Sequence, residues 1–500
     1  MPSVPVPFDA VPIAVRAAAV PTRGAAAIGA VFRRSVPVAL GLLLAGCAGT
    51  IVRENFDSAA SAVHPHLRAE PVWLTTDAMR AQAEHDVDEL LSRPLAADDA
   101  VRISLTYHPG VQAMLYERAV ESASITRTTR LPNPVFGFER LLRPEPGVRE
   151  LEITRALAFS LFDLIALPAR LETASLRQEQ VRAKLAAGVA GAAVAARENW
   201  VRAVAAQQTL EYARRTNEAA DAAAELARRM HEAGSLSTLQ RVREEAFAAE
   251  AATRLVRAEQ DTRATREALV RSLGLTGAQA ERLTLPERLP DLPGTLDDGP
   301  AAAQSALDER VDVRVARAEI GAAAREQGLT RIVGSIDAFS IGGVYKNDTG
   351  RTAQRGYTLE APLPLFDFGD AARVGAQSAY LAALNRVAQT IGDAGSQLRE
   401  ASGEYRAAYD VARRYRDDIV PRRKAISDDN LLRYNAMLIG TFELLADARE
   451  QIASVVQAIA AQRDFWLADA AVQAARIGLP AGDTTASAAV ASPGRSPTYE

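Results

Sequence analysis

Apolar residues in the last third of the chain recur at alternating steps of four and three positions. One such run extends from Tyr380 to Ile419, and a second extends from Leu445 to Trp466. This spacing places the apolar side chains on one stripe of an α-helix and is typical of a coiled-coil seam. We therefore predict a long helical hairpin over 370–478 with its turn around Met437–Gly440. The first run consists of Tyr380, Leu384, Val387, Ile391, Ala394, Leu398, Ala401, Tyr405, Ala408, Ala412, Tyr415 and Ile419, and the second of Leu445, Ala448, Ile452, Val455, Ile459, Gln462 and Trp466.

Two residues stand out within this hairpin. Pro421 lies inside its first helix, where the missing N–H group and the ring are predicted to kink or break the helix. Gln462 is the one polar member of the second run. A polar residue in a seam more often fixes the register of two helices than binds a ligand.

The first half of the chain has a similar but less regular pattern. No proline occurs between Ala169 and Leu285, and alanine weakens the apolar seam of this stretch. The segment His231–Ser235 interrupts it, with Gly234 placed to end a helix. We predict a second helical hairpin, whose first arm of about 65 residues would be roughly 100 Å long.

A shorter helix and two strand-like segments precede each predicted hairpin. Both pairs of strands are bounded by Pro, Gly or Asn, as strand ends commonly are. In the third strand the apolar and polar residues are mixed on both faces, so its periodicity alone is weak evidence. The predicted segments are helices over 97–128 and 301–330 and strands over Val135–Leu142, Arg149–Phe159, Ser335–Tyr345 and Tyr357–Leu365.

The same tripeptide occurs at both predicted passages from strand to long helix. Leu161-Phe162-Asp163 and Leu365-Phe366-Asp367 lie 204 residues apart, and Gly369 follows the second copy. A repeated strand-to-helix corner indicates two copies of one structural unit. The predicted organisation is a leader over 1–46, a tether that we expect to be extended over 47–96, a first repeat over 97–282, a linker over 283–300, a second repeat over 301–478 and a disordered tail over 479–500.

Composition narrows the class of protein. Of 500 residues, 48% are hydrophobic and only 5% are aromatic, so much of the apolar content is alanine, which suits closely packed helices. The net charge of −4 does not favour nucleic acid as a partner. The predicted fold class is therefore mainly α with a small β part.

The only cysteine, Cys47, follows an apolar run that resembles a signal peptide. Arg33 and Arg34 precede the apolar segment 36–44, which is too short to span a bilayer, and Leu44-Ala45-Gly46-Cys47 resembles a bacterial lipobox. Lipidation of Cys47 would anchor the mature chain. By resemblance to lipoprotein sorting, the absence of aspartate after Cys47 implies the outer membrane. An unmodified buried cysteine is the alternative.

The number of predicted strands bears on oligomeric state. Outside the leader, no run reaches the roughly 18 apolar residues that a membrane helix needs. A mature chain that crosses a bilayer would therefore do so as a closed barrel. Four strands cannot close a barrel, and an open duct needs roughly twelve. Three copies would supply them. The alternative is two surface hairpins on a helical protein.

The chain resembles the TolC-like outer membrane efflux proteins between about residues 97 and 478. The residues that bear the resemblance are Leu131-Pro132-Asn133-Pro134, the corner 361–369 and the turn region 434–449. The resemblance implies a homotrimer with a twelve-stranded barrel in the outer membrane and a long α-barrel in the periplasm. It also implies two partners, a periplasmic adaptor protein and an inner-membrane pump, which we expect to be of the RND type.

In this family the helical turns form the periplasmic tip, where the adaptor docks. The tip residues implied here are Gly234, Ser235, Ser237, Met437, Gly440 and Thr441. The family pattern fits His231, Gly234, Ser237 and Gln240 in the first turn. In the second turn Tyr434, Met437, Gly440 and Glu443 occupy the same places, but the glycine is displaced and Met437 departs from the pattern. Aligning Gly234-Ser235-Leu236 with Gly440-Thr441-Phe442 also matches, at a shift of three residues, so the register of the two turns stays open.

Glu443 and Asp447 lie one helical turn apart beyond the second tip. In a threefold assembly each would form a ring of like charges that selects cations, unless Arg433 or Arg449 paired with it. These four residues are candidate gate charges. A solvated helix face is the alternative.

No pattern indicates catalysis or a cofactor. The histidines, among them His64, His66 and His85, are scattered, and neither a zinc-protease motif nor a nucleophile elbow occurs. The expected function is the exit duct of a tripartite pump that passes small molecules or metal ions. The alternatives are a type I protein secretion duct and a lipid-anchored periplasmic coiled-coil protein without a pore.

Overall fold

The computed structural model describes residues 47–67, 69–145, 148–296, 307, 310–333, 339–363 and 365–479. The chain divides into two compact units, Met1–Thr50 and Ile51–Glu500, and the contacts discussed below lie within the second. The predicted leader over 1–46, residues 297–300 at the end of the predicted linker and residues 480–500 of the predicted tail lie outside the described residues. The boundaries of the two repeats stay a prediction.

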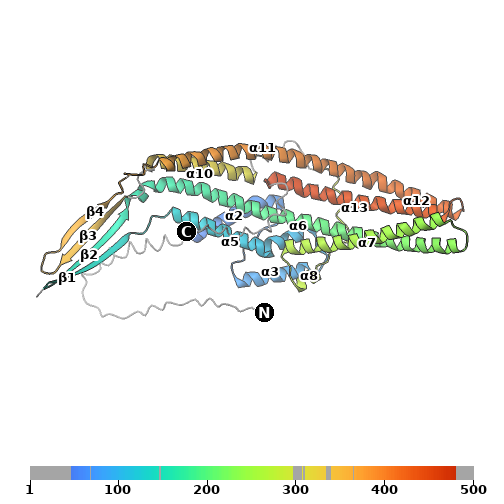
Figure 1. Ribbon diagram of the computed structural model, residues 1–500, viewed down its shortest axis with the longest axis horizontal. Helices are drawn as coiled ribbons and strands as arrows, with labels where there is room; N and C mark the ends of the chain where they lie inside the picture. The colour runs from blue at the N-terminus through green and yellow to red at the C-terminus, as the bar shows by residue number, and fades with distance from the viewer. Residues whose placement is uncertain are drawn as a thin grey trace. The chain divides into compact units, whose positions relative to one another are not determined.

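The fold is mainly helical with one small antiparallel sheet, which confirms the predicted fold class. Long helices run between the sheet and two helical turns (Figure 1). The same order of elements occurs twice: a short helix, a strand hairpin and a long helical hairpin. The elements are α2 Cys47–Leu67, α3 Asp77–Leu90, α4 Ala97–Tyr107, α5 Pro109–Thr128, β1 Val135–Glu145, β2 Val148–Ser160, α6 Leu161–Glu232, α7 Thr238–Leu273, α8 Ala278–Arg282, α10 Val311–Val333, β3 Ser340–Asp348, β4 Gln354–Glu360, α11 Asp370–Arg414, the π-helix η1 Tyr415–Ile419, α12 Val420–Asn435 and α13 Thr441–Ile477.

The sheet and the helices beside it share one lateral order. The strands follow β1-β2-β3-β4, all antiparallel. The helices connected to them pack as α5 on α6, α6 on α10 and α10 on α11. Each strand is therefore joined, at one of its ends, to a helix that lies at the same lateral position. Within the described chain, β1 and β4 are the two sheet edges, and α5 and α11 are the matching helices.

Alanine allows the long helices to pack closely. In α6, 13 of the 23 buried residues are alanine. Small side chains let helix axes approach without leaving voids, so a 72-residue helix can be packed along much of its length without a bulky core. Trp200 is an exception, and its indole N–H donates to the Leu95 carbonyl at 2.7 Å.

Arg310 is buried completely where α10 meets α11 and α13. Its guanidinium donates to both carboxylate oxygens of Asp312, at 3.0 and 2.6 Å. It also donates to the carbonyls of Ala394, at 3.3 Å, and Ala475, at 2.6 Å, and to the Gln397 amide oxygen at 3.0 Å. A buried charge is tolerated only when paired and hydrogen-bonded in this way. Arg310 thus joins three helices at one point.

The expected extended tether is wrong for most of its length. Residues after Cys47 form α2, and Asp77–Leu90 forms α3. The apolar residues Val52, Phe56 and Ala59 share one helical face, a spacing that the sequence analysis did not detect.

Several predicted boundaries also change. The helix over 97–128 breaks at His108, because Pro109 begins a new helix, and Gly274 ends α7 in a left-handed conformation (φ 70°). Helix α6 begins at Leu161, so Pro168 lies inside it. Strand β1 continues through Pro144, which an edge strand tolerates, while β4 ends at Glu360.

Both copies of the tripeptide lie at a passage from strand to long helix, as predicted, but their conformations differ. Leu161-Phe162-Asp163 forms the first turn of α6 immediately after β2. Leu365-Phe366-Asp367 lies in the segment between β4 and α11, which Gly369 ends with a left-handed backbone (φ 73°). The identity of the two tripeptides therefore does not extend to their conformation.

The seams are confirmed in part. Ala394, Leu398 and Tyr405 of α11 and Ile459 of α13 are buried, whereas Leu384 and Ile391 are exposed. Pro421 interrupts the helix as predicted, since the regular α pattern gives way to η1 just before it. Gln462 has a different role from the predicted one: its amide donates to the Pro290 carbonyl at 2.6 Å and fastens the linker to α13.

Candidate functional site

The two helical turns have the same backbone hydrogen bonds. In the first, the N–H groups of residues 233, 234 and 235 donate to the carbonyls of 229, 231 and 230. In the second, those of 436, 437 and 438 donate to 432, 434 and 433. Every position corresponds at an offset of 203. The structure therefore aligns Gly234 with Met437 and Ser237 with Gly440, and it excludes the alignment shifted by three residues.

The aligned turns differ in the residues that shape them. Gly234 has a φ of 74° and Met437 a φ of 61°, so a methionine takes a left-handed conformation that favours glycine. Ser237 caps α7, accepting from the Gln240 N–H while its own N–H donates to the Gln240 side chain. Gly440 precedes α13 in an extended conformation without a side-chain cap.

The second turn is also the more apolar at its surface. Met437 is 93% exposed and Leu438 is 74% exposed. At the corresponding place in the first turn, the Ser235 hydroxyl donates to the Met230 carbonyl. The Thr441 hydroxyl donates to the Tyr434 hydroxyl across the second turn, at 3.4 Å.

Among the candidate gate charges, only Arg449 links the two hairpins. It forms an ion pair with Glu244 of α7, and its guanidinium lies 4.0 Å from the centre of the Phe247 ring. Arg433 pairs instead with Asp429 on its own helix, at 2.9 Å. Neither arginine is paired with Glu443 or Asp447 in the described structure. The sequence analysis missed Glu244 because its partner lies 205 residues away.

Glu443 and Asp447 differ in surroundings. The Glu443 side chain is exposed. Asp447 is half-buried, and one of its carboxylate oxygens is buried without a hydrogen-bond partner among the described residues. At the offset of 203, Asp447 corresponds to Glu244, the acid that Arg449 does engage. Of these two equivalent acids, Glu244 is thus held by an ion pair and Asp447 is not.

The second corner between sheet and helices is apolar and exposed, whereas Leu161 and Phe162 of the first are half-buried. Phe366 is 97% exposed and Leu365 is 66% exposed. At the first corner, Asp163 pairs with Arg170 at 2.5 Å, whereas at the second the Asp367 carboxylate accepts from the Gly369 N–H at 2.7 Å. The two aspartates stabilise different local structures.

The strand register sorts side chains onto two unlike faces. One face, called the apolar face here, contains eleven large apolar residues, three arginines and no carboxylate among residues 135–142, 150–160, 340–348 and 354–360. The opposite, polar face contains the five carboxylates of these segments, Lys346, the apolar residues Val135, Leu141 and Val344, and otherwise small or uncharged polar residues. The mixed pattern described for the third strand therefore does not extend to the sheet as a whole. The apolar residues are Phe136, Phe138, Leu142, Leu151, Ile153, Leu157, Phe159, Ile341, Tyr345, Tyr357 and Leu359.

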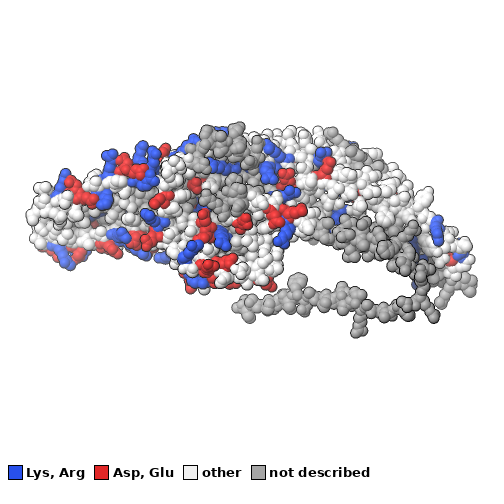
Figure 2. All heavy atoms as spheres, turned by 180° about the vertical axis from the view of Figure 1, so that it is seen from behind, with Lys and Arg blue, Asp and Glu red and all other residues white. Residues whose placement is uncertain are grey.

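Charge is distributed unevenly along the surface. Lys, Arg, Asp and Glu gather over the helices on the face drawn in Figure 2, while the part towards the sheet is largely without charge. Phe136, Tyr357 and Leu359 are more than half exposed. Among the described helices, none is long and apolar enough to cross a membrane.

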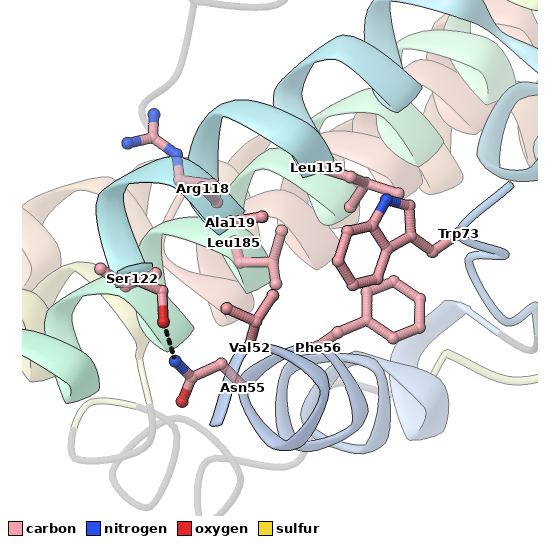
Figure 3. Close-up of a pocket in the computed structure, with 10 residues that line it drawn as sticks. Val52, Asn55, Phe56, Trp73, Leu115, Arg118, Ala119, Ser122 and Leu185 are labelled. Carbon is pink, nitrogen blue, oxygen red and sulfur yellow. Dashed lines mark hydrogen bonds between the residues drawn. The ribbon is translucent and has the colours of Figure 1, made fainter. Parts of the chain in front are cut away.

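Helix α2 packs on α5 and α6 through a small polar cluster. The Asn55 amide donates to Ser122 at 2.9 Å and to Gln178 at 2.7 Å, and Val52 and Phe56 point to the same small cavity (Figure 3). Trp73 lies beside Phe56. The predicted lipidation residue Cys47 begins α2, and its side chain lies outside the described part of the structure.

This combination of a four-stranded antiparallel sheet and long helical hairpins is the fold of TolC-like outer membrane proteins. The outer membrane protein VceC from Vibrio cholerae matches with a TM-score of 0.61 and 13% identity over 80% of this chain and 97% of its own. The outer-membrane channel OprN matches with a TM-score of 0.63 and 17% identity over 79% and 92%. The Campylobacter jejuni outer membrane channel CmeC matches with a TM-score of 0.59 and 12% identity over 81% and 89%.

Sequence comparison alone does not find this relationship. No protein-family model matches the chain, and no curated protein is similar to it in sequence. The low identities to the solved structures mean that the fold is what these proteins share.

Proposed function

We propose that the chain is the outer membrane channel of an efflux system and acts as a homotrimer. The observation that supports this most directly is the sheet, which has two unpaired edge strands and one apolar face. Unpaired edges are a liability unless another strand covers them. Pairing β4 of one copy with β1 of the next would close three copies into a twelve-stranded barrel. Its apolar face would meet lipid and its polar face would line the lumen.

The exposed helical seam supports the same assembly. Leu384 and Ile391 belong to the apolar run of α11, yet they are 44% and 45% exposed in the single chain. Helix α11 lies at one lateral edge of the helical layer and α5 at the other. In a trimer these edges would meet and the seam would be covered, giving an α-barrel continuous with the sheet.

The helical turns are proposed as the docking site of a periplasmic adaptor protein. They lie at the far end of the helices from the sheet (Figure 1). The exposed apolar residues Met437 and Leu438 are suited to binding an apolar partner surface. An inner-membrane pump would supply small molecules or metal ions through the adaptor, and lipidation of Cys47 would add an anchor in the outer membrane.

The contact between Arg449 and Glu244 is the proposed restraint on opening. It joins the two hairpins of one chain close to the turns. Separating the hairpins would expose this pair to water and lose the contact between Arg449 and Phe247. Channel opening at the turns would therefore require that this contact break.

Two matched substitutions on one strand test the channel proposal. Tyr357 faces the apolar side of β4 and its neighbour Thr358 faces the polar side. Tyr357→Lys is expected to impair insertion into lipid vesicles, since a lysine facing hydrocarbon costs about 2–4 kcal/mol near the bilayer centre. Thr358→Lys should insert normally and change only the ion selectivity of conductance.

The purified chain should run as a heat-labile trimer that needs detergent and should conduct in planar bilayers. A chain that stays soluble and monomeric without detergent would contradict the proposal. Equal effects of both lysine variants on insertion would contradict the assignment of the two faces.

A further inference from the structure

Two of the three arginines of the apolar face, Arg155 and Arg355, lie at one level of the sheet, and Arg140 lies two residues further from the helices. Arg140 is five residues beyond Val135, the first residue of β1. Arg155 and Arg355 are each five residues before the ends of β2 and β4, Ser160 and Glu360. Because strands rise about 3.4 Å per residue, Arg155 and Arg355 lie about 17 Å from the helical end of the sheet, and Arg140, which is opposite Ile153, lies about 7 Å further away. We call them the arginine row.

The arginine row is compact. Arg155 is opposite Phe138, and Arg140 is two residues further along β1, so these two arginines are diagonal neighbours about 7–8 Å apart at the backbone. Arg355 is separated from Arg155 by one strand, which puts it about 10 Å away. Its guanidinium lies 5.8 Å from the centre of the Tyr345 ring between them.

No acid on the same face neutralises this row. The carboxylates of the described strand residues Glu139, Glu152 and Asp348 all lie on the polar face, where Glu152 pairs with Lys346. Among the described residues, Arg140 and Arg155 are in no ion pair. The side chains of all three arginines are exposed. The face therefore presents three positive charges without a countercharge.

The position of the row matters because the proposed function places this face in lipid. The apolar residues of β1–β4 between the row and the helices, together with exposed corner residues such as Phe366, would form a band close to the roughly 25 Å of outer membrane barrels. An arginine facing hydrocarbon is costly, whereas one at the lipid interface is not. The row thus marks the depth at which the face leaves the hydrocarbon on the side away from the helices.

We propose that the arginine row binds the phosphate groups of an anionic lipid in the outer leaflet. Guanidinium groups form bidentate, charge-assisted hydrogen bonds with phosphate, and spacings of about 7–10 Å allow adjacent arginines to bind separate phosphates of one lipid. Three arginines per chain would give nine around a trimer. This inference rests on the proposed channel, because the helices must lie in the periplasm for the row to lie in the outer leaflet.

The test measures lipid retention by the full-length protein purified in an uncharged detergent. Lipid A with two phosphates and the same lipid after phosphatase treatment are added, and bound lipid is counted by native mass spectrometry. The wild type is expected to retain the phosphorylated lipid in preference to the phosphatase-treated lipid. The variant R140Q/R155Q/R355Q should lose this preference roughly a hundredfold, because about 1 kcal/mol for each of three arginines near a lipid surface corresponds to about two powers of ten in affinity.

A matched control removes the same charge from the helices. Arg102, Arg214 and Arg257 are exposed and, among the described residues, form no ion pair. R102Q/R214Q/R257Q should therefore retain lipid as the wild type does. If the triple variant does not fold, R155Q alone replaces it in the test, and it should lose less of the preference for phosphorylated lipid. Equal retention of both lipids by the wild type, or equal loss in the control, would overturn the proposal.

Two further measurements separate the possible sources of phosphate and the two proposals. Inorganic phosphate should not displace bound lipid at millimolar concentration, and complete displacement would indicate a site for free phosphate and overturn the lipid assignment. Conductance of the same preparations is measured in planar bilayers. Lipid selectivity without conductance would contradict the proposed channel, whereas conductance without selectivity would overturn the arginine row alone.

Discussion

Arg449 of α13 pairs with Glu244 of α7 and so joins two hairpins that are separated by about 200 residues of chain. The Glu244 side chain is only 11% exposed, and that of Arg449 is 24% exposed. Glu244 corresponds to Asp447 in the other hairpin. The contact is therefore asymmetric within the duplicated structure, and the two hairpins are expected to differ in how readily they move.

Glu244→Gln should loosen this contact, because a nearly buried arginine would lose its countercharge. We expect about 1–3 kcal/mol of local destabilisation, seen as faster amide exchange over residues 238–250, and a higher open probability in conductance recordings. Glu450→Gln is the control, since its pair with Arg423 is largely exposed and should contribute under about 1 kcal/mol. Equal exchange rates in the two variants would count against the restraint.

Arg310→Met should destabilise the whole chain rather than the turns. Asp312 would keep a partly buried charge without its partner, and two carbonyls would lose a donor. The expected cost is about 3 kcal/mol or more, measured by thermal unfolding in detergent. Arg314→Met, one turn along the same helix, removes an exposed arginine 3.7 Å from Glu179 and should change stability little. A similar loss in both variants would refute the role of Arg310.

Exchanging the residues of the two turns should reveal backbone strain. Met437→Gly is expected to stabilise the chain by up to about 1 kcal/mol, since glycine takes a positive φ without penalty. Gly234→Met should destabilise it by a similar amount. Denaturation measurements of both variants test this, and changes of the same sign in both would contradict it.

Gly440 has an ordinary extended backbone, and a Cβ there would meet no atom within 4 Å. Gly440→Ile should therefore leave the fold and the trimer intact. A loss of efflux in that variant would support adaptor docking at this turn. Normal efflux with an intact trimer would argue against docking there. Gly440→Ser, which can cap α13, provides a small control substitution.

His108 predicts a pH dependence. Its Nδ1 accepts from the Gly110 N–H at 2.9 Å, which fixes the neutral ring and makes Nε2 the donor to the Arg271 carbonyl at 3.0 Å. Burial lowers the pKa of His108 below its usual value, although its backbone hydrogen bond to Arg271 opposes this. Since the folded pKa is the lower one, the stabilisation is present above about pH 6.5 and is lost as the pH falls through the folded pKa.

Thermal unfolding of the wild type and His108→Asn between pH 5 and 8 measures this effect. Asparagine can still cap α5 but does not titrate in this range. The stability difference between the two should change as the pH falls below about 6.5. A constant difference across the range would exclude His108 as the titrating group.

Local sequence pattern was sufficient for the helical hairpins and their turns. The repeated four-and-three spacing and the break at Gly234 depend on residues within a few turns of one another. They can therefore be recognised in the sequence without knowledge of the tertiary structure. The same reasoning failed for α2, whose apolar face is short.

The candidate gate charges illustrate the limit of such reasoning. Spacing along one helix singled out Glu443 and Asp447, but the residue that Arg449 engages is Glu244 on another helix. No local signal indicates such a partner, because its position is set by how α7 and α13 pack. The equivalence of Glu244 and Asp447 likewise became visible only from the hydrogen bonds of the two turns.

By itself the sequence determined the helical class, the duplication and the positions of the turns, because these follow from periodicity and from residues that end helices. The tertiary structure alone decided which side chains share a face of the sheet and which charges meet between hairpins. Alternation within one strand shows which of its own residues share a side, but only the register of the four strands aligns Phe136, Leu157 and Tyr357 on one face. Contacts of this kind join residues far apart in the chain, so they depend on packing and not on local pattern.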